Sequence, residues 1–171
     1  MGNSINPYVV LTTVKDKSAS EYNINPSTRV IGPSAFQDCS SFSSINIPAS
    51  VVSIGNRAFG FCYNMSSVVF FGNDSLLYID TGAFYLCNNL ISFTLPDSVK
   101  SIGYEAFAIC SRLESIVIGK NVVSIDQYAF DACGELKYIY YRGSAEEWSA
   151  IDIAKNNSYL EKATVSYNHV A

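Results

Sequence analysis

Five cysteines are the residues of this chain with the clearest capacity for chemistry, because a thiolate can attack a substrate, bind a metal ion or form a disulfide. Successive cysteines lie 23 or 25 residues apart, each at the same point of a repeated pattern. Their odd number prevents complete pairing within one chain, and no Cys-x-x-Cys pair or Cys/His cluster offers zinc ligands. We therefore expect no metal site and five buried free thiols that pack as small apolar groups. These residues are Cys39, Cys62, Cys87, Cys110 and Cys133.

The remaining candidates for catalysis are one histidine and scattered carboxylates. His169 lies close to the C-terminus, where we expect a solvated tail, so no triad can form around an ordered base. Glycine-rich phosphate loops and EF-hand loops do not occur in the sequence. The sequence thus predicts no catalytic residues, no cofactor and a protein that is not an enzyme. The carboxylates expected in solvated loops of separate repeats are Asp38, Asp80, Asp126 and Asp131.

A repeated unit must position the cysteines. The stretch from Ile102 to Ile125 reads I-x-x-x-A-F-x-x-C-x-x-L-x-x-I-x-I-x-x-x-V-x-x-I, and its closing Ile opens the next unit. Spacings of three and four around the Cys predict a short helix or 3₁₀ segment. The I-x-I alternation predicts a strand with one buried face, and V-x-x-I predicts a second short extended piece. Units of this size bury their apolar stripes only by stacking, so we expect a solenoid. The five units begin at Ile31, Ile54, Ile79, Ile102 and Ile125.

The segments outside the five units are expected to cap a single domain of residues 1–171. Residues 1–30 are predicted to form an N-terminal cap containing a hairpin, and residues 142–171 a C-terminal cap. In the C-terminal cap, Ser144 and Glu147 predict a capping box before a short helix with Trp148 as the lid of the core, followed by a last strand from residue 163 to 167. A two-residue excess in the second unit predicts a loop at residues 71–75.

Composition limits the partners. Apolar residues make up 49% of the chain and charged residues 15%, so much of it must be buried. The net charge of −4 argues against nucleic acid or an anionic membrane surface as a partner. No apolar run approaches the roughly 18 residues that span a bilayer, so we expect no membrane insertion. The first residues lack the zones of a signal peptide.

The motif A-F-x-x-C-x-x-L-x-x-I-x-I-P, cleanest in Ala83 to Pro96, resembles the BspA-like leucine-rich repeat family of bacterial and some protozoan surface proteins. The resemblance covers Ile31 to about Tyr141, and the tail from Gly143 to Asn168 is also similar. It implies an α/β leucine-rich-repeat horseshoe with a parallel sheet on the concave side, and adhesion or protein binding at a cell surface or after secretion. It implies no catalytic or cofactor residues, and it leaves a cytoplasmic location open.

The outward positions of the I-x-I strands are the candidate binding site. They become more apolar toward the C-terminal repeats, which a recognition face would explain, although a hydroxyl-rich and β-branched surface also suits any strand. We expect a monomer that binds a protein there, with binding centred on the two tyrosines and helped by rim loops near residues 72–75 and 142. The alternative is a glycan-binding surface. The candidate residues are Ser44, Asn46, Ser67, Val69, Ser92, Thr94, Ser115, Val117, Tyr138 and Tyr140.

Overall fold

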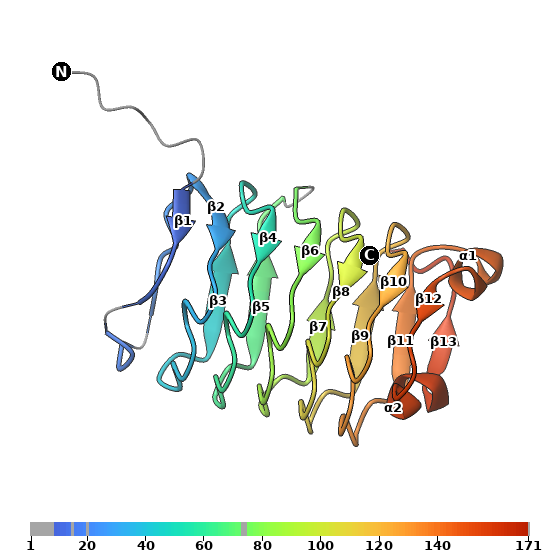
Figure 1. Ribbon diagram of the computed structural model, residues 1–171. Coiled ribbons are helices and arrows are strands. Elements are labelled where there is room, and N and C mark those ends of the chain that lie inside the picture. Colours follow the sequence, from blue (N-terminus) through green and yellow to red (C-terminus); the bar gives the residue numbers. More distant parts are fainter. Residues whose placement is uncertain (1–8, 15, 20, 73–74, 171) are drawn as a thin grey trace.

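The chain folds into a parallel β-solenoid, seen here in a computed structural model that describes residues 9–14, 16–19, 21–72 and 75–170 (Figure 1). One side of the stack is a continuous sheet of seven short parallel strands, each paired with the equivalent strand of the next turn. Along the sheet these are β1 (Val9–Leu11), β2 (Thr28–Ile31), β4 (Ser53–Ile54), β6 (Tyr78–Ile79), β8 (Ser101–Ile102), β10 (Ser124–Ile125) and β12 (Asp152–Ile153).

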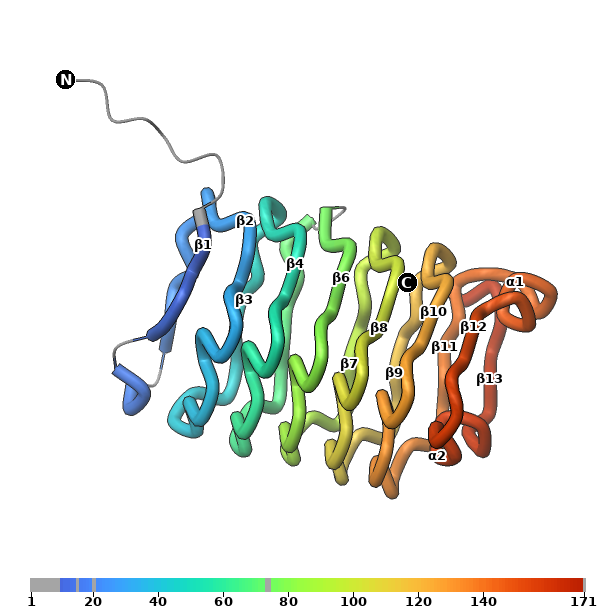
Figure 2. The backbone as a smooth tube through the Cα atoms, viewed as in Figure 1, coloured from blue at the N-terminus to red at the C-terminus, as the bar shows by residue number. Residues whose placement is uncertain are grey.

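Longer parallel strands line the opposite side of the solenoid (Figure 2). Their side chains alternate between core and solvent, as the I-x-I pattern predicts: in β3 the burial pattern is exposed, buried, exposed, buried. These strands form two separate sheets, one of two strands and one of four. The first contains β3 (Ser44–Ile47) and β5 (Ser67–Phe70), and the second contains β7 (Ser92–Thr94), β9 (Ser115–Ile118), β11 (Tyr138–Tyr141) and β13 (Thr164–Ser166).

The Ala-Phe-x-x-Cys segments form consecutive turns, so the prediction of a short helix or 3₁₀ segment is wrong. In the fourth unit, Glu105 and Ile109 have φ values of 54° and 59°, which interrupt a right-handed helix. The backbone N–H of Phe107 donates to the carbonyl of Ala129 in the next unit at 2.8 Å. A helix would need that N–H for its own hydrogen bonds, so bonding between units replaces bonding within one helix.

The centre of the core is a column of five phenylalanine rings, one from each unit. All five are fully buried. Neighbouring rings have centroids 4.9 to 5.3 Å apart and planes within 10° of parallel. This separation is close to the distance between paired strands, so the ring column and the three sheets share one repeat distance. The rings belong to Phe36, Phe59, Phe84, Phe107 and Phe130.

The prediction of five buried free thiols is confirmed. Four of them donate a hydrogen bond to the carbonyl of a core phenylalanine in the preceding unit; Cys62 Sγ, for example, lies 3.1 Å from the carbonyl oxygen of Phe36. Burial disfavours the thiolate and raises the pKa of Cys62 to about 12. The cysteines therefore act as packing groups, with weak hydrogen bonds that link adjacent units.

The N-terminal segment forms one more turn of the solenoid, and the predicted hairpin is wrong. Strand β1 pairs in parallel with β2, and Asn23 makes an isolated parallel bridge with Asn46. The ring of Tyr22 packs edge-on against Phe36, with centroids 5.0 Å apart. This segment therefore covers the first core ring by continuing the stack of parallel strands.

The C-terminal segment closes the other end. The predicted capping box is confirmed: Ser144 and Glu147 bond each other's backbone N–H groups at the start of helix α1 (Ala145–Ser149). Trp148 packs edge-on against Tyr141 with centroids 5.2 Å apart, as expected of a lid. Strand β12 and a second helix, α2 (Ser158–Lys162), follow. Strand β13, at residues 164–166, lies within the predicted last strand.

A buried asparagine ends the ladder of hydrogen bonds. In each of the first four units the N–H of the core phenylalanine donates to an alanine carbonyl of the next unit, but Phe130 has no such unit after it. Its N–H donates instead to Asn157 Oδ1 at 3.2 Å. Asn157 Nδ2 in turn donates to the carbonyls of Asp126 and Ala154, both at 2.9 Å. One side chain thus replaces part of a missing repeat.

Candidate functional site

All ten predicted site residues lie on one surface, which we call the long-strand face: the outward positions of β3, β5, β7, β9 and β11. Within each sheet the pairing aligns them in two rows that cross the strands. Each side chain is exposed or partly exposed, and β13 extends both rows by one residue. One row is Ser44, Ser67, Ser92, Ser115 and Tyr138, and the other is Asn46, Val69, Thr94, Val117 and Tyr140.

The long-strand face is interrupted between β5 and β7, which carry no pairing with each other. At this point Phe93 occupies the inward position that Ile or Val fills in the other four units. Its ring packs edge-on against Phe84 and Phe107 at 4.9 Å, and against Phe70 at 5.9 Å. The one aromatic ring in this row of inward side chains thus lies next to the interruption, on the core side of the strands.

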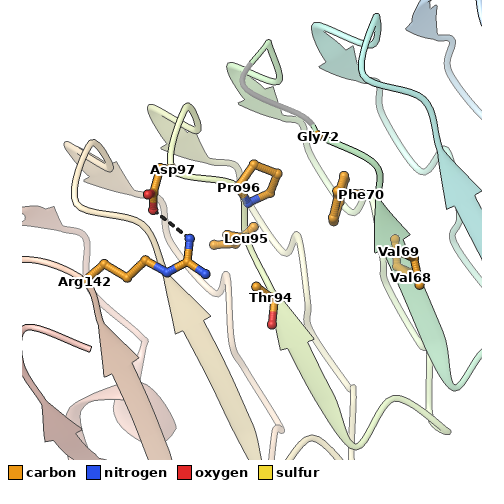
Figure 3. Close-up of a pocket in the computed structure, with 9 residues that line it drawn as sticks. All are labelled: Val68, Val69, Phe70, Gly72, Thr94, Leu95, Pro96, Asp97 and Arg142. Atoms are coloured by element: carbon orange, nitrogen blue, oxygen red, sulfur yellow. Dashed lines mark hydrogen bonds and ion pairs between the residues drawn. The ribbon is translucent and has the colours of Figure 1, made fainter. Parts of the chain in front are cut away.

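A pocket of about 380 Å³ opens at this interruption, at the carboxyl ends of the strands (Figure 3). One wall comes from β5 and includes two of its valines and a phenylalanine, and the other comes from the end of β7 and the turn after it. Val69 and Thr94, two of the predicted site residues, thus line the same pocket from opposite sides. The lining residues are Val68, Val69, Phe70, Gly72, Thr94, Leu95, Pro96, Asp97 and Arg142.

An ion pair closes the C-terminal side of the pocket. Arg142 Nη1 lies 3.0 Å from Asp97 Oδ1, and a dashed line marks this ion pair in Figure 3. Arg142 is the first residue after β11, and Gly119 holds the equivalent place after β9. A Cβ atom at Gly119 would lie 2.7 Å from the Cα of Asp97 and 2.9 Å from its Oδ1. The missing side chain at Gly119 therefore leaves the space in which Asp97 meets Arg142.

The guanidinium of Arg142 is largely enclosed but keeps unused hydrogen-bonding capacity. Its side chain is 20% exposed, and among the described residues its buried Nε has no hydrogen-bond partner. A second pocket of about 290 Å³ adjoins the ion pair and is also lined by Lys120, His169 and Val170. Positive charge thus gathers at this end of the face, in a chain whose net charge is −4.

The two predicted tyrosines differ in their surroundings. Their rings stack with centroids 6.4 Å apart and planes 21° from parallel. Tyr138 is 49% exposed, whereas His169 packs on Tyr140 with ring centroids 4.8 Å apart. The expectation of a solvated tail at His169 is therefore wrong: its backbone N–H also donates to the carbonyl of Tyr141 at 3.0 Å. Of the two tyrosines, Tyr138 presents the more open ring.

Among the described residues, no group of three or more His, Cys, Asp or Glu side chains is placed to hold a metal ion. None of the helices within the same ranges has the length and apolar character needed to cross a membrane. The predicted loop at residues 71–75 is described only in part: Gly72 has a φ of 52°, while residues 73 and 74 lie outside the described residues.

Sequence reasoning identified the face but not the pocket. The strand pattern was enough to place the ten outward residues together, and residue 142 was expected at the rim. Two signals pointed to the interruption: the Phe at position 93 in a row of Ile and Val, and the two-residue excess after β5. The pairing of Asp97 with Arg142 had no local signal, because it joins residues 45 positions apart.

Comparison with solved structures supports the same architecture. A leucine rich cell surface protein from Faecalibacterium prausnitzii A2-165 superimposes with a TM-score of 0.75 at 32% identity, covering 79% of this chain and 35% of that chain. A leucine rich repeat protein of T. pallidum gives 0.71 at 26% identity, covering 81% and 65%. The pneumococcal vaccine antigen PcpA gives 0.71 at 18% identity, covering 92% and 46%, and shows likeness of fold alone. The present chain thus spans less than two thirds of each of these proteins.

Sequence comparison identifies the family. A search of curated protein sequences found no match. The BspA type leucine rich repeat region matches residues 14–164 in six copies, starting within the N-terminal turn and ending at the first residue of β13. The match therefore includes residues 14–30, which precede the five sequence units, and residues 142–164, which follow them. The chain belongs to the BspA-type leucine-rich repeat family.

Proposed function

We propose that this protein is a non-catalytic binding module that recognises another protein through the long-strand face. The observation that carries the proposal is the interrupted face itself: two aligned rows of exposed side chains meet an open pocket with an apolar wall and an arginine. Val69 and Tyr138 are 40% and 49% exposed on this face. Partly exposed apolar groups beside a polar anchor are typical of binding surfaces.

The size of the face suggests how a protein partner engages it. Five strands about 4.8 Å apart, each presenting about four residues at about 3.3 Å, give a sheet of roughly 300 Å². A standard interface buries about 800 Å² on each partner. The partner must therefore also contact the rim at Gly72 and Arg142, or gain affinity through several linked copies of the module.

We further propose that the module acts at the cell surface or after secretion. The F. prausnitzii protein that resembles it is a cell surface protein. Exposed binding modules in such settings commonly act as adhesins, which need a rigid scaffold with a changeable surface. The stacked turns meet that need, because outward residues can vary without disturbing the inward rows.

Glycan binding is the second candidate, and one observation favours it. The rings of Tyr138 and Tyr140 stack on β11, next to the hydroxyl side chains of Ser115 on β9 and of Thr164 and Ser166 on β13. Aromatic rings offer flat apolar contacts, and hydroxyls offer both donors and acceptors for sugars. A glycan array would detect this function, and loss of any signal in Tyr138→Ala would assign it to the tyrosines.

Photo-crosslinking on intact cells tests the protein-binding proposal. A benzophenone amino acid replaces Thr94 on the long-strand face in one variant and the exposed Val123, beside β10 on the opposite sheet, in another. Protein partners should be captured through position 94 and not through position 123. Capture only through position 123 would place binding on the other side of the solenoid.

A further inference from the structure

Three pockets follow one another along the carboxyl ends of the long strands, and we name them together the groove. At its N-terminal end a pocket of about 380 Å³ has a largely apolar lining, and Phe71 projects there with 58% of its surface exposed. This pocket is lined by Asn23, Ile24, Pro26, Asn46, Pro48, Ala49 and Phe71. The pocket at the sheet interruption follows, with Phe70 and Gly72 on either side of Phe71 in the sequence.

The C-terminal end of the groove is cationic. The pockets at the interruption and beyond it share Asp97 and Arg142, so they form one path. Lys120, Arg142 and His169 all line the last pocket, and Asp97 supplies the only carboxylate among its lining residues. The ammonium group of Lys120 and the guanidinium of Arg142 are two cations against that one carboxylate, in a chain of net charge −4. An anionic group is therefore favoured at this end and at no comparable place along the groove.

Arg142 has hydrogen-bond donors to spare for such a group. A guanidinium carries five N–H donors in a fixed fork, and Asp97 engages Nη1. The ion pair holds the fork against the groove wall, which lowers the entropy that a ligand must remove on binding. The position is thus organised in advance to receive a carboxylate.

We propose that this groove binds an extended peptide segment that carries an apolar side chain and, four residues later, a glutamate or aspartate. The inference rests on the proposed function and specifies the partner chemistry of the same side of the molecule. The apolar side chain contacts Phe71 and the neighbouring prolines, and the carboxylate pairs with Arg142 and Lys120.

The spacing follows from the repeat. Phe71 and Arg142 are the first residues after β5 and β11, which are three turns of the solenoid apart. Two of these steps are between paired strands about 4.8 Å apart, and at the third, between the unpaired β5 and β7, the stacked core rings Phe59 and Phe84 lie 5.3 Å apart. The three steps separate the two residues by about 15 Å, and four residues of extended chain cover about 13 Å. Side chains of an extended peptide alternate between two sides, so residues four apart point into the groove together, whereas residues three or five apart do not.

A peptide fits the groove better than an acidic polysaccharide does. Five of the seven residues that line the N-terminal pocket have side chains without hydrogen-bonding groups, and Asn23 and Asn46 are the two polar ones. An apolar peptide side chain buries surface against those five residues. The polysaccharide remains an outcome that the experiment can detect.

The test uses fluorescein-labelled nine-residue peptides of Ser, Thr and Gly with one Phe and one Glu at spacings from two to six. Fluorescence anisotropy with the full chain should show the tightest binding at a spacing of four, at least fivefold tighter than at three or five. Replacing the peptide Glu by Gln should weaken binding at least tenfold. In Arg142→Ala this Glu-to-Gln difference should shrink to less than twofold.

Controls separate the groove from general charge effects. Arg112→Ala removes an exposed arginine outside the groove and should leave the Glu-to-Gln difference intact. Phe71→Ser should weaken the binding of the Phe peptide and should leave unchanged the affinity of a peptide with Ala in place of Phe. The peptide substitutions need no change in the protein, so misfolding of Arg142→Ala would not obscure the result.

Three outcomes would overturn the inference: equal affinity at all spacings, no detectable peptide binding, or Arg142-dependent binding of the polyuronate alginate without binding of peptides. Crosslinking through position 94 is an independent readout, since it detects any protein on the long-strand face. Capture there without peptide binding would contradict the groove inference alone. Absence of both the capture through position 94 and the peptide binding would contradict the proposed function as well.

Discussion

Asp97 and Arg142 form a 3.0 Å ion pair across Gly119, although they lie 45 positions apart in the sequence. The stacking of equivalent turns brings them to neighbouring positions, and the glycine between them leaves the required space. Because both side chains are partly exposed, the pair itself contributes little to stability. Its main consequence is the fixed direction of the arginine at the end of the groove.

Gly119→Ala is expected to disturb this arrangement and to destabilise the fold by about 1 to 3 kcal/mol. The added Cβ would meet the Cα of Asp97 at 2.7 Å, and backbone atoms cannot move aside cheaply. Urea denaturation measures the change in the free energy of unfolding. Gly134→Ala is the matched control, because its Cβ would have no heavy atom within 4 Å, and it should stay within about 0.5 kcal/mol of wild type.

Phe107→Ala should cost about 3 to 5 kcal/mol, as removal of a buried ring does. Phe107 is fully buried between Phe84 and Phe130, with centroid distances of 5.2 and 5.3 Å. Phe71→Ala makes the same chemical change at a side chain that is 58% exposed and should cost less than about 1 kcal/mol. Equal losses in the two variants would contradict the assignment of the ring column as the core.

Stability should fall at alkaline pH because of the thiols. The pKa of Cys62 is raised by burial from 9.0 to about 12, and that of Cys133 is raised likewise to about 12. Between these values the unfolded thiol releases its proton while the folded thiol keeps it, so rising pH favours unfolding. Below pH 9 the contribution is fully present.

Cys62→Ala isolates this effect. Between pH 9 and 10.5 its unfolding free energy should decline less steeply than that of wild type, by up to about 1.4 kcal/mol per pH unit. Urea denaturation at several pH values measures the two slopes. Identical slopes would mean that the folded thiol ionises as readily as the unfolded one, against the burial found for Cys62.

Asn157→Ala should destabilise the C-terminal end by at least about 2 kcal/mol, because the N–H of Phe130 and two backbone carbonyls lose their partner. In this variant, exchange of the backbone amide hydrogen should become faster at Phe130, with a smaller change at Phe59. Asn56→Ala, at an exposed position, is the control and should change neither quantity. Unchanged exchange at Phe130 in the Asn157 variant would refute the role of Asn157 in ending the ladder.

The sequence was informative wherever a physical requirement recurs in every unit. Phe107 and Cys110 keep their spacing because each unit must fill the same volume, so the core, the strand faces and the free thiols could all be predicted. The turn was misjudged because spacings of three and four also suit a helix. Glu105 has a positive φ there, and a glutamate in a sequence does not indicate that conformation.

Features that occur once were harder to predict. Asn157 acts as a substitute for a missing repeat, and nothing in its neighbouring residues signals that role. His169 was expected in solvent because it is near the end of the chain, but its ring packs on Tyr140. The pocket lies where β5 and β7 do not pair, and its ion pair depends on the absence of a side chain at Gly119. Both features follow from the three-dimensional arrangement and not from a local sequence pattern.

The most direct test of the binding account is the affinity of a crosslinked partner for two variants that add the same bulky charge to opposite sides of the solenoid. Thr94→Arg places the charge on the long-strand face, and Val123→Arg places it beside the opposite sheet. Because both positions are exposed, the melting temperatures of the two variants should stay close to that of wild type. Surface plasmon resonance should show at least tenfold weaker binding for Thr94→Arg and less than a twofold change for Val123→Arg. Unchanged affinity in Thr94→Arg, or a larger loss in Val123→Arg, would contradict the account.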